Sequence, residues 1–184
     1  MSHSVVVLGS ANMDLVVRQE RAVLPGETMF GRSFSTGPGG KGLNQAVAAA
    51  RAGAEVAFVG AVGGDAFGAQ LREVLTSDGI DVSHVLASDA PTGIAAITVT
   101  DDGENSIVVV SGANSHTELT DAERALIADA SHLVVQLERP LDLVRDAMQF
   151  ARSAGVVTVL TPAPVVAGLE ELVALADILI PNGH

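Results

Sequence analysis

Short, uninterrupted apolar runs recur along the chain and alternate with longer segments that have a helical pattern. Runs of this kind are typical of strands buried on both faces, as in a parallel sheet. They lie at 5–8, 56–62, 133–137, 156–160 and 178–180. Helices are expected between them, at about 43–52, 66–76, 120–129, 141–153 and 169–176. This alternation predicts an α/β fold: a doubly wound, mainly parallel sheet flanked by helices.

Two other stretches are β-prone, and in the first of them polar and apolar residues alternate. The first is 16–36, interrupted by Pro25 and Gly31, and the second is 93–110, with an Asp-Gly turn at 101–105. Asp-Gly chemistry between two apolar runs favours a hairpin. We expect the two stretches to form one small antiparallel β-sheet lid on the main sheet.

Three local signals mark helix boundaries. Asp65 stands where an N-cap residue is expected, and this structural role is preferred to a catalytic one. Thr120 and Glu123 have the spacing of a capping box. Gly53 follows the segment 43–52 at the position that favours glycine after a helix.

Composition excludes several classes of protein. The 184 residues are 48% hydrophobic but 3% aromatic, which suits one domain with a core of Val, Ile, Leu and Ala. A net charge of −12 leaves no basic patch for nucleic acid. There is no cysteine for disulfides or thiolate chemistry, and the five histidines lack metal-ligand spacing. With no secretory leader and no apolar run that could cross a bilayer, we expect a cytoplasmic protein without a membrane partner.

The stretch 36–50 combines residues that disfavour regular structure with an Ala-rich helix. The residues expected to form a tight loop are Gly37, Pro38, Gly39, Gly40 and Gly42. Such a loop would lead into a helix N-terminus, where free N–H groups and the positive end of the dipole attract oxygen-rich ligands. Lys41 adds a charge there, and Asn44 adds an amide that both donates and accepts.

Three kinds of binding site are considered for this loop. A dinucleotide would suit the G-x-G-x-x-G spacing of 37–42, but the preceding 34–36 is short and half polar for a buried strand. A P-loop is excluded because Lys41 is followed by Gly42 rather than Ser or Thr. A polyol, with hydroxyls bound by amides and Asn44, is the third possibility. The structural alternative is a tight turn with a surface lysine.

Two carboxylates follow predicted strands closely. Asp14 lies after the run 5–8, and Glu138 ends the run 133–137. Open α/β sheets bind ligands at the carboxyl ends of their strands. Because a carboxylate accepts hydrogen bonds from two donors, the pair suits a small polyhydroxy ligand. Asn12 lies beside Asp14, although an Asx turn would also explain it.

Taken in order, these motifs resemble the PfkB carbohydrate kinase family. The matching segments are 9–14, 39–46, 62–68, 136–138 and 181–182, which together extend over nearly the whole chain. The segment Gly-Gly-Lys-Gly-Leu-Asn-Gln-Ala is most similar to that of the ribokinases within the family. The resemblance implies a ribokinase-like fold and ATP-dependent phosphorylation of a sugar hydroxymethyl group, with ribose as the first candidate. It also implies Mg²⁺ and K⁺ as cofactors.

The resemblance assigns roles to individual residues. Those implied to bind the sugar are Asn12, Asp14, Gly39, Gly40, Lys41, Asn44 and Glu138. Asn182 would belong to a Pro-Asn-x-x-Glu motif that helps to place Mg²⁺ near the nucleotide phosphates. The lid would cover the substrate and pair two subunits into a homodimer. No catalytic residue and no metal ligand is assigned.

Two features of the family pattern are missing from residues 1–184. These are the Gly-Ala-Gly-Asp segment, which carries the catalytic base and an anion hole, and the nucleotide-binding strands with the K⁺ site. We therefore expect the sugar-binding, amino-terminal part of one kinase domain, inactive by itself. The alternatives are a noncatalytic sugar-binding or interaction module, a kinase for another sugar or nucleoside and, more distantly, a dinucleotide enzyme.

Overall fold

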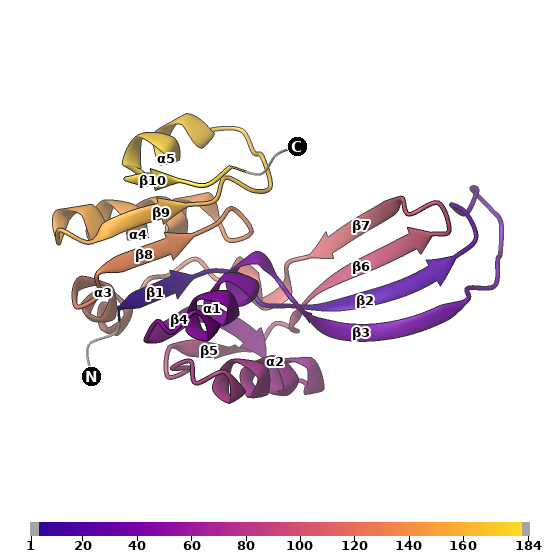
Figure 1. Cartoon of the computed structure of the whole chain (residues 1–184), viewed down its shortest axis with the longest axis horizontal. Helices are drawn as coiled ribbons and strands as arrows, with labels where there is room; N and C mark the ends of the chain where they lie inside the picture. Colours follow the sequence, from indigo (N-terminus) through magenta and orange to yellow (C-terminus); the bar gives the residue numbers. More distant parts are fainter. Residues whose placement is uncertain (1–3, 182–184) are drawn as a thin grey trace.

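A computed structural model describes residues 4–181. Its body is a six-stranded sheet, from which a second, four-stranded sheet projects to one side (Figure 1). The body strands lie in the order β10-β9-β8-β1-β4-β5, and each neighbouring pair is parallel. They are β1 (Val5–Leu8), β4 (Val56–Gly63), β5 (Val85–Ser88), β8 (His132–Val135), β9 (Val157–Leu160) and β10 (Ile178–Leu179).

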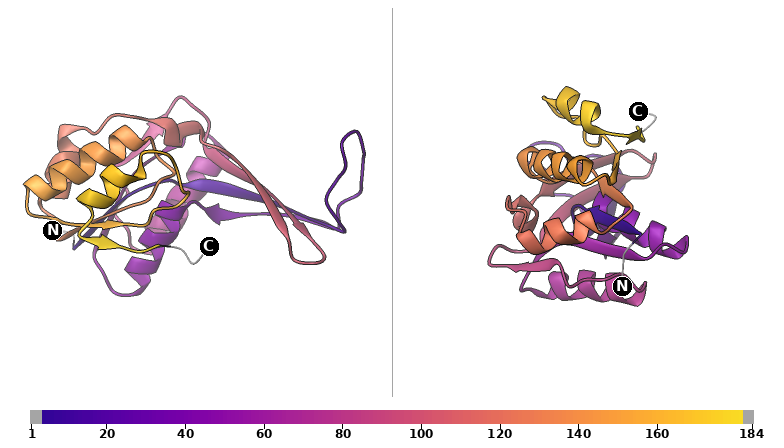
Figure 2. Two further views of the ribbon diagram at one scale, coloured as in Figure 1. Left: turned by 90° about the horizontal axis from the view of Figure 1, so that it is seen from above. Right: turned by 90° about the vertical axis from the view of Figure 1, so that its left-hand side faces the viewer.

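Helices cover both faces of the body sheet, which confirms the predicted doubly wound α/β fold (Figure 2). One face carries α1 (Lys41–Arg51) and α2 (Ala66–Ser77), and the other carries α3 (Asp121–Ala128), α4 (Leu141–Ser153) and α5 (Leu169–Leu175). A short 3₁₀ helix, η1 (Gly112–Ser115), precedes α3.

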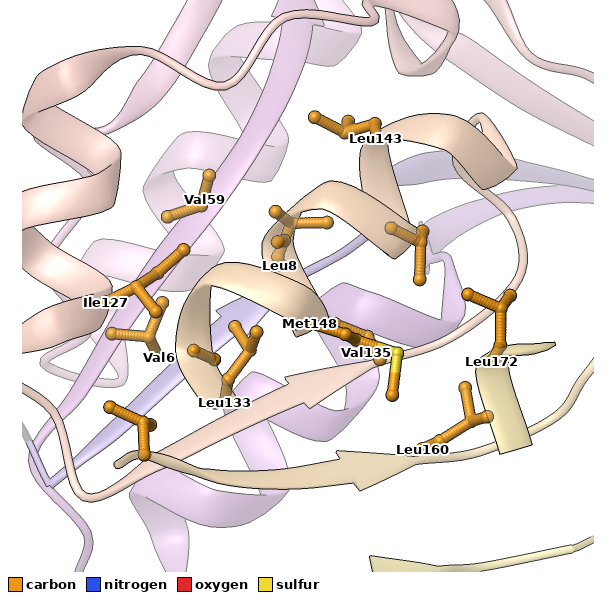
Figure 3. Packing of buried hydrophobic residues seen from close by; sticks show 14 of the residues in the cluster. Val6, Leu8, Val59, Ile127, Leu133, Val135, Leu143, Met148, Leu160 and Leu172 are labelled. Carbon is orange, nitrogen blue, oxygen red and sulfur yellow. The ribbon is translucent and has the colours of Figure 1, made fainter. Parts of the chain in front are cut away.

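The core is divided between the two faces by the alternation of side chains along each strand. In β1, Val6 and Leu8 pack in the cluster beneath α3, α4 and α5, whereas Val7 packs with α1 and α2. Figure 3 shows the first cluster, in which Leu133 and Met148 are fully buried. Burial on both faces explains why the body strands are uninterrupted apolar runs.

The predicted helix caps are present. Asp65 accepts a hydrogen bond from the amide of Gly68 at 2.9 Å, and Thr120 and Glu123 form a reciprocal capping box. Asp65 also accepts from the amide of Thr92 at 2.8 Å and from its hydroxyl at 2.6 Å. These hydrogen bonds join the N-terminus of α2 to Thr92, the residue just before the strand that begins at Gly93 in the projecting sheet.

The projecting sheet is the lid. Its strands lie in the order β3-β2-β6-β7: β2 (Asn12–Gln19), β3 (Ser33–Gly39), β6 (Gly93–Thr100) and β7 (Asn105–Val110). The prediction of an antiparallel lid is wrong for the central pair, because β2 and β6 run parallel. The first segment is also longer than the predicted 16–36, because β2 begins close to the end of β1.

The glycine-rich stretch is not the loop that its composition predicts. Gly37, Pro38 and Gly39 pair with Asp14, Met13 and Asn12 as the end of β3. An edge strand tolerates proline because the missing N–H is needed by no neighbour on that side. Helix α1 starts two residues after the strand ends, so Gly40 alone connects them, with φ of 93°.

The strand order places a switch point beside β1. The chain runs from β1 to β4 and β5 on one side, then returns to β8 and continues to β9 and β10 on the other. The connections leave opposite faces of the sheet at this point, which opens a crevice at the carboxyl ends of β1 and β8. Ligands of open α/β sheets bind in such crevices.

Candidate functional site

A cleft of about 720 Å³ lies at this crevice and extends under the lid. Six of the seven residues predicted to bind the ligand line it: Asn12, Asp14, Gly40, Lys41, Asn44 and Glu138. They come from β2, from α1 and the residue before it, and from the segment after β8. Segments far apart in the sequence therefore converge on one site.

Glu138 holds the base of the cleft together. One carboxylate oxygen accepts from the hydroxyl of Ser10 at 2.5 Å and from the backbone amide of Lys41 at 2.9 Å. The other lies 3.4 Å from the ammonium nitrogen of Lys41. A carboxylate at a helix N-terminus is favoured by the helix dipole. Glu138 therefore caps α1 from a different part of the chain.

The first amides of α1 are already occupied, contrary to the expectation that they would face a ligand. The amide of Lys41 donates to Glu138, that of Gly42 donates to the Ser10 hydroxyl at 3.5 Å, and that of Leu43 donates to the Ser10 carbonyl at 2.9 Å. These amides are therefore not an anion-binding site. A ligand in the cleft is therefore expected to be bound by side chains rather than by these amides.

Asp14 projects from β2 over Gly39. A Cβ added at Gly39 would lie 2.2 Å from a carboxylate oxygen of Asp14. Gly39 does not line the cleft; its contribution is the space that it leaves for this carboxylate. Burial, and then the charge of Glu138, raise the pKa of Asp14, while Lys41 acts in the opposite direction. Asp14 therefore keeps its proton to a higher pH than an exposed aspartate.

Gly40 lines the cleft, but a glycine is needed there because of the backbone conformation. Its φ is positive, and an added Cβ would lie 2.8 Å from the carbonyl oxygen of Ser10 and 2.9 Å from the amide nitrogen of Asn12. Side chains at such positions are strained and would collide with main-chain atoms. The close passage of α1 past the chain between β1 and β2 therefore depends on this glycine.

Sequence reasoning missed three residues that shape the site: Ser10, Asn114 and Arg139. Asn114, on η1, binds the main chain of Ala11. The guanidinium of Arg139 donates to the carbonyls of Gly9 at 3.3 Å and His116 at 3.1 Å, and burial lowers its pKa to about 10. Asn114 and Arg139 line the cleft as well. All three act through long-range contacts, for which a short motif carries no signal.

The lid closes the cleft with an apolar surface. Its contribution from β6 and β7 consists of Ala95, Ile97, Ile107 and Val109. Polar side chains and aliphatic carbon therefore line the same cleft, which suits a ligand that has both hydroxyls and an apolar face, such as a sugar ring.

One predicted binding residue cannot be placed in the cleft. Asn182 lies outside the described residues. Among residues 4–181, no group of three or more His, Asp or Glu could hold a metal ion. In the same part of the chain, no helix has both the length and the apolar character needed to cross a membrane.

The family model for pfkB family carbohydrate kinases matches residues 2–184. The chain belongs to this family. It is 44% identical to a ribokinase of Haemophilus influenzae over 99% of this chain and 60% of the relative. A ribokinase of Schizosaccharomyces pombe is 40% identical over 98% of this chain and 60% of the relative.

A solved structure agrees with the sequence comparison. Arabidopsis thaliana ribokinase complexed with ribose and ATP superimposes with a TM-score of 0.86 at 34% identity, over 99% of this chain and 61% of that chain. The chain thus spans about 60% of the length of the curated relatives it matches.

Proposed function

We propose that this chain is the sugar-binding part of an ATP-dependent ribokinase, which converts D-ribose to ribose 5-phosphate. The observation that carries the proposal is the cleft itself, which Asp14, Lys41 and Asn44 line together with aliphatic residues of the lid. Ribokinases at 40% and 44% identity, and the Arabidopsis ribokinase complexed with ribose and ATP, support the same substrate and phosphoryl donor.

Each side chain has a role that its chemistry allows. The ionised carboxylate of Asp14 accepts hydrogen bonds from two sugar hydroxyls, and Asn12 and Asn44 add amide contacts. Glu138 holds α1 and Lys41 in place and offers its remaining acceptor capacity to the sugar. Gly39 and Gly40 let the main chain and Asp14 come close enough to form the site.

ATP, Mg²⁺ and K⁺ belong to the proposal through the family. Among residues 4–181, no group of three or more His, Asp or Glu could hold a metal ion, and the first amides of α1 are occupied and so do not hold phosphates. When bound, ATP supplies the phosphoryl group. Transfer also needs charge stabilisation at that group and a base for the sugar hydroxyl, which we assign to neither Asp14 nor Glu138. We therefore propose that residues 1–184 alone bind the sugar without phosphorylating it.

The lid supports a further part of the proposal, a homodimer. Both of its edge strands carry exposed apolar side chains, including Phe34 on β3 and Val108 on β7, which are 64% and 65% exposed. Uncovered edge strands of this kind favour pairing. We propose a cytoplasmic enzyme that pairs through its lids and has no nucleic-acid or membrane partner. Sedimentation should show a dimer that Val108→Lys dissociates, and a strictly monomeric wild type at high concentration would contradict this.

The proposal is tested by calorimetry with ribose and by a coupled ATP assay on the same preparation. Ribose should bind, and ATP-dependent turnover should be absent until the nucleotide-binding part, as present in the longer relatives, is added. Turnover by the 184 residues alone, lost in Asp14→Asn, would refute the division of labour. Sugar binding that never yields turnover in the mixture would favour a noncatalytic module.

A nucleoside kinase is the second candidate. The cleft extends past the polar residues to an apolar wall that includes Leu141, Pro164 and Val166. Such a wall could hold a base attached to the sugar. Adenosine binding more tightly than ribose in the same calorimetric experiment would favour this candidate.

A further inference from the structure

Two buried asparagines from distant parts of the chain meet at the root of the lid. Asn12 is the first residue of β2, and Asn114 lies on η1, directly after the lid. They are 3% and 2% exposed, and both line the cleft. The Nδ2 group of Asn114 donates to Oδ1 of Asn12 at 2.8 Å.

The orientation of the Asn114 amide is fixed by the main chain. Its Oδ1 accepts from the backbone N–H of Ala11 at 3.0 Å, and its Nδ2 donates to the carbonyl of the same residue at 3.1 Å. A backbone N–H can only donate and a carbonyl can only accept. If the amide were turned over, its NH₂ group would face the N–H of Ala11, and its oxygen would face the carbonyl oxygen of Ala11. Both contacts would be buried and without a hydrogen bond, which is strongly unfavourable.

The orientation of Asn12 follows from that of Asn114. Because Nδ2 of Asn114 is a donor, the atom of Asn12 that it meets must be the acceptor, Oδ1. The Asn12 NH₂ group is then directed away from Asn114. Among the described residues it donates no hydrogen bond to protein, and the side chain lines the cleft.

We propose that Asn114 is a positioning residue that makes Asn12 a hydrogen-bond donor toward the substrate. The cleft then presents a donor at Asn12 and an acceptor two residues later at Asp14. A sugar would meet the pair with one oxygen acting as acceptor and neighbouring hydroxyls acting as donors. This inference rests on the proposed function for the identity of the ligand, but the orientation of the amide does not depend on it.

The same contact joins the strands of the lid at its root. Asn114 follows β7, Asn12 begins β2, and Gly93 begins β6. A Cβ added at Gly93 would lie 2.4 Å from Nδ2 of Asn114 and 2.4 Å from Oδ1 of Asn12. The donor at Asn12 is thus held where the strands of the lid leave the body.

The first test needs no sugar. NMR measures hydrogen exchange of the Asn12 side-chain NH₂, whose signals are assigned by their loss in Asn12→Asp. In the wild type the group is free of protein acceptors and should exchange rapidly. In Asn114→Asp, measured at a pH where the new carboxyl is ionised, the carboxylate cannot donate, so Asn12 turns over and its NH₂ becomes hydrogen-bonded. Exchange should slow by about threefold to tenfold, the scale of one net hydrogen bond. Equal exchange in the two proteins would overturn the inference.

The second test reads the polarity of the cleft. Calorimetry compares ribose analogues in which one hydroxyl is replaced by fluorine, a weak acceptor, or by hydrogen, which does not accept. At one carbon the fluoro analogue should bind the wild type about twofold to fivefold more tightly than the deoxy analogue, the lower end of a net hydrogen bond. Asn114→Asp, and independently Asn12→Asp, should abolish or reverse this preference.

The controls separate positioning from general damage. Asn105→Asp introduces the same charge on the exposed lid strand β7, outside the cleft, and should leave the analogue preference unchanged. If the wild type binds no ribose, the proposed function fails, while the exchange measurement still decides the orientation. If ribose binds and the preference persists in both cleft variants, the inference is wrong.

Discussion

Two strands of similar apolar composition have opposite environments. All eight residues of β4 are buried, because α1 and α2 cover one face of the body sheet and α3, α4 and α5 cover the other. All six residues of β7 are exposed, although four of them are Ile or Val. The body therefore derives its stability from burial, whereas the lid is an uncovered sheet held mainly at its root.

This difference separates stability from binding in the same molecule. Residues such as Leu133 fix the body, while the cleft is formed where body and lid meet. Side chains of β7 can face ligand or a second subunit because they are exposed, whereas Met13 at the root of the lid packs with α1 and α2. Four experiments test this separation, from the largest expected effect to the smallest.

Removing a large side chain should matter in the body far more than in the lid. Leu133, fully buried in β8, should lose about 2–5 kcal/mol of unfolding free energy in Leu133→Ala, because a cavity remains. Ile107→Ala in β7 should cost less than about 1 kcal/mol, because this side chain is 53% exposed. Urea unfolding measures both changes. Equal losses would show that the lid is as well packed as the body.

Where β3 leads into α1, substitution of Gly40 should lower stability, whereas substitution of Gly37 should not. Gly40→Val places a side chain at positive φ against main-chain atoms and should cost about 1–3 kcal/mol or more. Gly37→Val is the matched control in β3, where an added Cβ meets nothing within 4 Å. Thermal unfolding should show a large loss of stability for Gly40→Val and little change in stability for Gly37→Val. A stable Gly40→Val would mean that the α1 connection is not constrained.

Asp14 should affect binding without affecting the fold. Asp14→Asn should weaken ribose binding by about 1.5–3 kcal/mol, the range for hydrogen bonds to a charged group. Its unfolding free energy should stay close to that of the wild type, because the side chain is half-buried at the rim of the cleft rather than in the core. A folded variant with unchanged ribose affinity in calorimetry would remove Asp14 from the site.

The pH dependence of binding should move when Lys41 is changed. Burial raises the pKa of Asp14 above its ordinary value of 3.8, so ribose affinity should fall as pH decreases through that raised pKa. Lys41 lowers this pKa, and Lys41→Met should shift the fall to higher pH. The free energy of unfolding should change in the opposite direction. Because the folded chain binds the Asp14 proton more tightly than the unfolded chain does, Asp14 contributes less to stability as pH rises through its raised pKa. A pH profile unchanged by Lys41→Met would contradict the coupling.

Much of the body could be predicted because its signals are local. The run 5–8 is apolar at every position, and Asp65 and Thr120 form caps with amides three residues away. Periodicity and capping are properties of neighbouring residues. Six of the predicted ligand-binding residues also line one cleft, because β2 and Glu138 follow the adjacent parallel strands β1 and β8, and the start of α1 is bound to Glu138.

The rest could not be predicted because pairing outweighs local preference. Gly37–Gly39 has low strand propensity, yet it forms a strand by pairing with the start of β2. The amides of α1 are occupied by Ser10 and Glu138, which no pattern within 36–50 reveals. Asn114 lies in a polar connection, and its role depends entirely on Ala11 and Asn12.

The cap that Glu138 places on α1 also sets an order of events in folding. Its hydrogen bonds close sequence separations of 128 residues to Ser10 and 97 residues to Lys41. Closing such loops costs entropy before any contact compensates for it, so long-range pairings form slowly. During synthesis, the nascent chain cannot assemble the cleft until β8 and Glu138 have emerged and docked beside β1. Appearance of the sugar-binding site therefore reports that the two halves of the body sheet have joined.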